Sequence, residues 1–141
     1  MSQENVEIVG RLFEAAARED WVEVEGLFDP DCEIDDFDMP DASGYRGHEG
    51  FFDWVAAWDD AWDSWELNDP EIHTSASGKL IALFTVAAKG RSSGIELKRR
   101  DAMVYEMHGD KIARVEYYNE QQRELALEAA GLREEDLKPA E

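Results

Sequence analysis

Apolar residues recur every three or four positions in three parts of the N-terminal half, which is the spacing of one helix face. The first pattern predicts a helix ending near residue 17, with apolar positions Val6, Val9, Leu12, Phe13, Ala16 and Ala17. A short second helix is expected after Asp20, a residue type that often caps helix N-termini, and before Asp29-Pro30. A third helix is predicted over residues 48–62, with Phe51, Val55, Trp58 and Trp62 on one face.

The rest of the pattern is mainly that of strands, bounded by turn residues such as Gly and Asp. Strands are predicted over residues 32–38, 65–74, 80–89, 95–107 and 111–118, and a last helix over 120–130 ends at Gly131. Helices first and strands later favour an α+β fold. We expect a cone-shaped α+β barrel, in which three N-terminal helices pack on a curved, mostly antiparallel sheet and leave a conical cavity.

The length of 141 residues fits one domain, which we place at residues 1–132, followed by a charged, mobile tail over 133–141. The formal net charge of −20 disfavours nucleic acid and anionic membranes as partners, because their phosphates would be repelled. No apolar run is long enough to span a bilayer, and the acidic N-terminus lacks the features of a signal peptide. A cytoplasmic location is therefore expected.

Asp36 is the most informative candidate residue. Side chains alternate along a strand, so Asp36 shares the expected inward side of the first strand with Cys32 and Ile34. Burial raises the pKa of a carboxyl group, which suits a general base in an apolar cavity. The alternative is a carboxylate at the strand end that is capped by a backbone N–H or paired with an arginine.

Asp101 is the second candidate for catalysis. It shares one strand face with Arg99, Met103 and Tyr105, and the opposite face is not clearly more apolar. If Asp101 lies buried near Asp36, one of the two acids tends to keep its proton. The alternative is a salt bridge from Asp101 to Arg99 or Arg100.

Aromatic residues concentrate on the third helix and around it. A stripe at helical spacing indicates burial in the core, and it is compatible with a flat pocket wall for a ring-bearing ligand. The residues predicted to line the pocket are Trp58, Trp54, Tyr45, Met103 and Tyr117. The three histidines show no metal-binding spacing, and phosphate-loop and nucleophile-elbow motifs are absent, so neither a metal nor a cofactor is expected.

Residues 19–32, 44–50, 110–118 and 127–132 together resemble the nuclear transport factor 2-like superfamily, and in particular its SnoaL-like branch, which includes polyketide cyclases. Ketosteroid isomerases are similar members of this superfamily. Their pattern implies that Asp36 is a general base and that Asp101 is a protonated oxyanion-hole acid. Leu12 stands where their oxyanion-hole tyrosine is expected.

This resemblance implies a cofactor-independent isomerase, cyclase or dehydratase that acts on a small apolar carbonyl compound, either cyclic or open-chain, held in an internal cavity. Because the fold hosts many functions, a non-catalytic ligand-binding or protein-interaction module is the alternative. Arg114, Glu116 and Tyr118 alternate on one face of the last strand. We expect a homodimer through this sheet face.

Overall fold

The computed structural model describes residues 2–39, 44–91 and 93–137. Four α-helices and two short 3-10 helices are α1 (Ser2–Ala17), α2 (Trp21–Gly26), α3 (Gly47–Ala61), α4 (Arg123–Ala130), η1 (Glu120–Gln122) and η2 (Glu134–Leu137). Six strands are β1 (Phe28–Asp36), β2 (Tyr45–Arg46), β3 (Trp62–Thr74), β4 (Leu80–Gly90), β5 (Glu96–His108) and β6 (Lys111–Tyr118).

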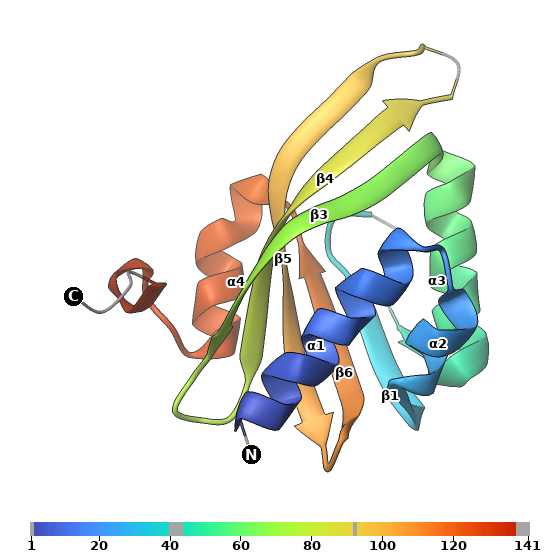
Figure 1. Cartoon of the computed structure of the whole chain (residues 1–141). Helices are drawn as coiled ribbons and strands as arrows, with labels where there is room; N and C mark the ends of the chain where they lie inside the picture. Colours follow the sequence, from blue (N-terminus) through green and yellow to red (C-terminus); the bar gives the residue numbers. More distant parts are fainter. Residues whose placement is uncertain (1, 40–43, 92, 138–141) are drawn as a thin grey trace.

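The strands form one curved, unclosed sheet in the order β2-β1-β6-β5-β4-β3 (Figure 1). Neighbouring strands run antiparallel except for β1 and β6, which are parallel. The predicted α+β class and the curved, mostly antiparallel sheet are therefore confirmed.

Strand β1 begins four residues earlier than predicted. Its pairing with β6 is irregular between Phe28 and Glu33, the stretch that contains Pro30. Proline lacks a backbone N–H and is found at edges or bulges of sheets. The alternation of inward and outward side chains that predicts this strand therefore begins only after Pro30. At the other end, Asp38 lies in the turn that follows the strand.

The first three helices pack on the concave face of the sheet, as expected (Figure 1). Val9, Leu12 and Phe13 of α1 are buried there, and α3 adds Phe51, Trp54 and Trp58. Each set recurs at helical spacing, so each helix buries a single apolar face in the main core. This burial places the aromatic face of α3 opposite β1 and β6.

Helix α4 covers part of the opposite face of the sheet. Its residues Ala126, Leu127 and Ala130 form a second core with Ile81 and Val104 from the outer side of β4 and β5. Since β4 is covered on both faces, its residues form a continuous apolar run rather than an alternating one. The homodimer expected through the outer face stays a prediction, and any such contact has to accommodate α4.

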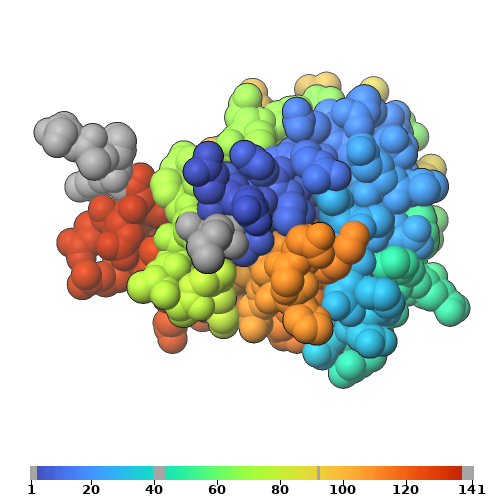
Figure 2. Space-filling model, turned by 60° about the horizontal axis from the view of Figure 1, so that its bottom comes forward, coloured from blue at the N-terminus to red at the C-terminus, as the bar shows by residue number. Residues whose placement is uncertain are grey.

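Part of the expected tail packs against α4. Residues expected in the tail form η2, where Glu134 accepts a hydrogen bond from Arg123 at 2.7 Å and Leu137 packs on the second core. Residues 138–141 lie outside the described residues, and the predicted domain boundary stays a prediction. Figure 2 brings the bottom of the molecule in Figure 1 forward, where the β5–β6 hairpin (orange) lies against α1 and α2 (blue). Within the described part of the chain, no helix is both long and apolar enough to cross a membrane.

Candidate functional site

Asp36 is the last residue of β1 and faces the interior. Its side is shared with Cys32 and Ile34, which are fully buried, and Asp36 itself is only 1% exposed. The inward orientation predicted from strand alternation is thus observed. A carboxylate in this position is costly unless hydrogen bonds satisfy it.

Four N–H groups donate to the two oxygens of Asp36. The backbone N–H groups of Asp38 and Met39 donate to Oδ1 at 2.9 and 3.3 Å. The indole Nε1–H groups of Trp54 and Trp58 donate to Oδ2 at 2.8 and 2.9 Å. The two tryptophans are one helical turn apart on α3, so both rings reach the same oxygen.

Burial raises the pKa of Asp36, and the hydrogen bonds from the two indoles and from Asp38 act against that rise. The net shift is upward, toward the range in which a carboxylate accepts a proton from a weak carbon acid. The backbone cap that sequence reasoning offered as the alternative is present. The two indole donors could not be read from the sequence, because they come from another element.

Asp101 on β5 is also 1% exposed, but its partners differ from those of Asp36. The Arg99 guanidinium binds both of its oxygens, with Nε at 2.7 Å from Oδ1 and Nη2 at 2.9 Å from Oδ2. The Tyr117 hydroxyl donates to Oδ2 at 2.6 Å. Both Asp101 oxygens thus accept hydrogen bonds, and the role of Asp101 as an oxyanion-hole acid stays a prediction. The salt bridge left open as the alternative is what forms.

Arg99 also connects Asp101 to the end of β1. Its Nη2 donates to Asp38 Oδ2 at 2.7 Å, and the Asn119 side-chain amide donates to Asp38 Oδ1 at 3.1 Å. Although burial opposes it, hydrogen bonds and the charges of both aspartates raise the pKa of Arg99 above its ordinary value. The two candidate acids therefore belong to one connected network, since Asp38 also donates its N–H to Asp36.

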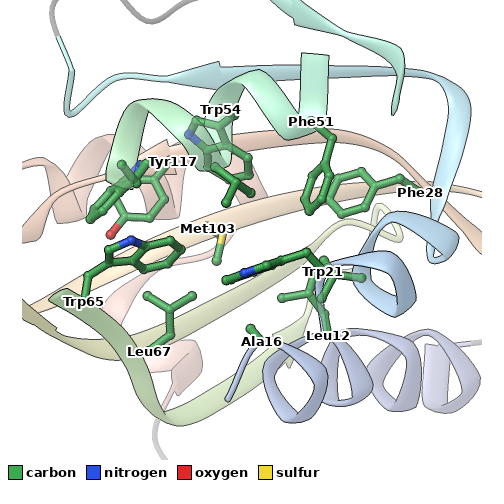
Figure 3. Close-up of a pocket in the computed structure, with 13 residues that line it drawn as sticks. Leu12, Ala16, Trp21, Phe28, Phe51, Trp54, Trp65, Leu67, Met103 and Tyr117 are labelled. Carbon is green, nitrogen blue, oxygen red and sulfur yellow. The ribbon is translucent and has the colours of Figure 1, made fainter. Parts of the chain in front are cut away.

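Beside this network lies an apolar cavity of about 40 Å³. Figure 3 shows its wall of rings from β1, β6 and α3, faced by Leu12 and Ala16 of α1. The lining residues are Leu12, Ala16, Trp21, Val24, Phe28, Phe51, Trp54, Val55, Trp58, Trp65, Leu67, Met103 and Tyr117. This volume holds only a few water molecules, because the aromatic side chains fill most of the space between the three helices and the concave face of the sheet.

Four of the five residues predicted to line the pocket do so, namely Trp54, Trp58, Met103 and Tyr117. Tyr45 is not among the lining residues. It lies on the outermost strand, β2, and packs against Gly50 near the start of α3. Burial raises the pKa of Tyr45, and the nearby charges of Asp36 and Asp53 add to the rise.

Outside the cavity lies a second, open hollow of about 270 Å³. The two share Ala16, Trp21, Trp65 and Leu67, and the indole rings of Trp21 and Trp65 stack at 5.4 Å between centroids. Carboxylates surround this outer hollow at Glu19, Asp59, Asp63 and Glu66. A ligand that reaches the cavity through the outer hollow would therefore pass between carboxylates and then contact the rings of Trp21 and Trp65.

The site thus combines the buried carboxyl group of Asp36, the hydroxyl of Tyr117 and an apolar cavity. Burial, with the charge of Asp101 next in importance, holds the pKa of Tyr117 well above its ordinary value, so its hydroxyl keeps its proton. Among the described residues, no group of three or more His, Cys, Asp or Glu side chains is placed to hold a metal ion.

The family model of the SnoaL-like domain matches residues 9–115, which contain both candidate acids and the helix that carries the two indoles. The chain belongs to the SnoaL-like family. None of the curated protein sequences matches it.

Solved structures similar to this SnoaL-like protein share its fold. A proposed polyketide cyclase from Xanthomonas campestris is 19% identical, with a TM-score of 0.74 over 88% of this chain and 96% of that one. A proposed isomerase from Bacillus subtilis is 17% identical, with a TM-score of 0.68 over 92% and 93%. TerC, co-crystallised with polyporic acid, is 16% identical, with a TM-score of 0.72 over 86% and 95%. Likeness at this level of identity shows a nuclear transport factor 2-like fold and not an activity.

Proposed function

We propose that this SnoaL-like protein is a cofactor-independent acid–base enzyme acting on a small apolar, ring-bearing carbonyl compound, as an isomerase, cyclase or dehydratase does. The observation that carries the proposal is the environment of Asp36. Its carboxylate is buried, its pKa is raised, and its Oδ2 atom is held by two indoles that also line the apolar cavity. Perturbed carboxylates beside a pocket are the usual sign of acid–base chemistry.

In the proposed reaction, Asp36 takes a proton from the carbon next to the carbonyl group of the ligand. The C–H bond breaks, its electron pair forms the enolate, and the proton passes to Oδ2. Return of that proton to a second carbon completes an isomerisation. In a dehydration, the enolate electron pair forms a C=C bond, the C–O bond to a β-hydroxyl group breaks, and the hydroxyl takes the proton from Asp36 and leaves as water. Each role needs the carboxylate ionised at the start and protonated in the intermediate.

Tyr117 is the donor best placed to stabilise the enolate oxygen. Its ring lines the cavity and its hydroxyl keeps its proton, which points to Asp101 in the unliganded protein. In our proposal the hydroxyl turns from Asp101 to the ligand oxygen. Asp101 is then a positioning residue, which Arg99 holds in place through two hydrogen bonds. One donor of this type is typically worth on the order of 2.7–4 kcal/mol in the transition state.

Two similar folds support the proposed reaction class by their names, one a proposed polyketide cyclase and the other a proposed isomerase. TerC, which was co-crystallised with polyporic acid, supports the binding of a small organic molecule by this fold.

The test is proton exchange in deuterated water, followed by NMR, with a panel of cyclic enones. Asp36→Asn should abolish the exchange that the unaltered protein catalyses. Asp35→Asn is the matched control, because Asp35 lies next to Asp36 on the outer face and pairs with Arg114. Unchanged exchange with Asp36→Asn would remove Asp36 as the base.

A second candidate function is non-catalytic binding of a small apolar ligand. It is favoured by the saturation of Asp36, since a carboxylate has about four acceptor positions and all four are filled. Under this function, tryptophan fluorescence should change with added ligand while mass spectrometry finds no product.

A further inference from the structure

The Oδ2 atom of Asp36 has no acceptor position left for a ligand. Trp54 and Trp58 both donate to it, at 2.8 and 2.9 Å, and both are buried, at 8% and 3% exposure. A molecule that is to meet this oxygen has to take the place of one indole N–H.

The cavity imposes the same requirement through its size. At about 40 Å³ it holds a few water molecules and not a ring. Both indoles line it, so a planar ligand enters only where an aromatic side chain moves aside. The side chain that makes room is then also one that caps the carboxylate.

The ring contacts indicate which indole moves. The outer hollow and the cavity share Trp65, and Trp58 packs directly on Trp65 with 5.4 Å between centroids. Both indoles contact the ring of Tyr117, but among the described aromatic rings Trp54 has no contact with Trp65. A ligand that arrives through the outer hollow therefore meets Trp58 before it meets Trp54.

We infer that the ligand of this site is a planar molecule of about two fused rings bearing an acidic O–H, a phenol or an enol, which displaces the Trp58 indole and donates to Asp36 Oδ2 in its place. The displaced group is itself a planar bicycle, so its space matches such a ligand. This inference rests on the proposed function, in which Asp36 faces the bound molecule, and it adds the ligand class.

The requirement for an O–H follows from the cost of leaving a buried acceptor unsatisfied. Loss of the Trp58 N–H leaves Oδ2 with a single donor, and a buried charged acceptor that loses a partner is destabilised. A phenol restores the missing hydrogen bond, whereas its methyl ether does not. We expect the phenol to bind roughly tenfold more tightly than the ether.

The experiment follows the five tryptophan indole N–H signals of the ¹⁵N-labelled protein by NMR while 2-naphthol or 2-methoxynaphthalene is added. Trp54→Phe and Trp58→Phe each remove one signal and so assign it. On addition of 2-naphthol, the Trp58 signal should move strongly while the Trp54 signal stays near its place. An unmoved Trp58 signal with bound 2-naphthol overturns the inference, and so does equal affinity for the two probes.

The two variants also give a matched comparison of affinity. Trp58→Phe removes the group that has to be displaced, so both probes should bind roughly tenfold more tightly, with the preference for 2-naphthol retained. Trp54→Phe leaves Trp58 in place and should change neither affinity by more than about twofold. An equal gain in the two variants, or no binding of either probe to the unaltered protein, refutes the inference. The proposed function fails separately, in the exchange assay with Asp36→Asn.

Discussion

Replacing Arg99 with methionine tests the buried network most directly. Methionine keeps much of the apolar stem and removes the guanidinium, which donates two hydrogen bonds to Asp101 and one to Asp38. The Asp101 side chain is fully buried, so its charge then lacks a counter-ion and keeps only the Tyr117 hydroxyl.

The expected loss of stability is large for a single substitution. Breaking a buried ion pair by removing one partner costs about 3–5 kcal/mol. Arg99 is 21% exposed and Asp38 is partly exposed, so water can solvate part of the vacated site. We therefore expect about 3 kcal/mol, which for a domain of this size lowers Tm by roughly 10 °C.

The assay is urea unfolding at neutral pH, with the double variant Arg99→Met, Asp101→Asn as the decisive comparison. Asparagine removes the unpaired charge and still accepts from Tyr117, so the double variant should recover roughly 2 kcal/mol of the loss. The reasoning is refuted if Arg99→Met loses less than about 1 kcal/mol, or if the double variant is no more stable than the single one.

Two further predictions concern Asp36 and the start of α3. Because burial raises the pKa of Asp36 above 3.8, the folded protein binds a proton there at a pH where the unfolded chain does not. The contribution of Asp36 to stability is thus present at low pH and is lost as the pH rises through the raised pKa. In urea titrations, the unaltered protein should therefore lose stability relative to Asp36→Asn as the pH rises above about 4. Gly47 has a φ of 68°, and an added Cβ would lie 3.1 Å from the Pro30 carbonyl oxygen. Gly47→Ala should therefore lower the free energy of unfolding by roughly 1–2 kcal/mol, whereas Gly10→Ala, which meets no atom within 4 Å, should not lower it.

The order of elements and the burial of Asp36 could be predicted from the sequence because both depend on local patterns. Helical spacing gives the apolar faces of α1 and α3, and alternation along β1 gives the side of Asp36. The inward direction of Tyr117 and the outward direction of Arg114 follow from the same alternation in β6. Such patterns are retained in the folded protein because the periodic apolar face is the one that packs into the core.

The partners of the two acids could not be predicted in the same way. Arg99 and Asp101 share a strand face, so the sequence offers a salt bridge between them as an alternative. The contact of Arg99 with Asp38 depends on the turn after β1, which the pattern of the strand does not describe. Likewise, the sequence pattern does not say that α4 returns to the outer face, since its short apolar stripe fits either side of the sheet. The size of the cavity depends on side-chain packing, which no periodicity records.

The parallel pairing of β1 with β6 has a consequence for how the protein is made. Asp35 and Arg114 are in contact although they are 79 positions apart, and the backbone N–H of Phe37 donates to the carbonyl of Tyr117. A nascent chain on the ribosome therefore carries β1 paired at most with β2 until residues 111–118 of β6 have been translated. Contacts of such long sequence separation slow folding, and the pocket around Asp36 is assembled only after Tyr117 of β6 has been added to the chain.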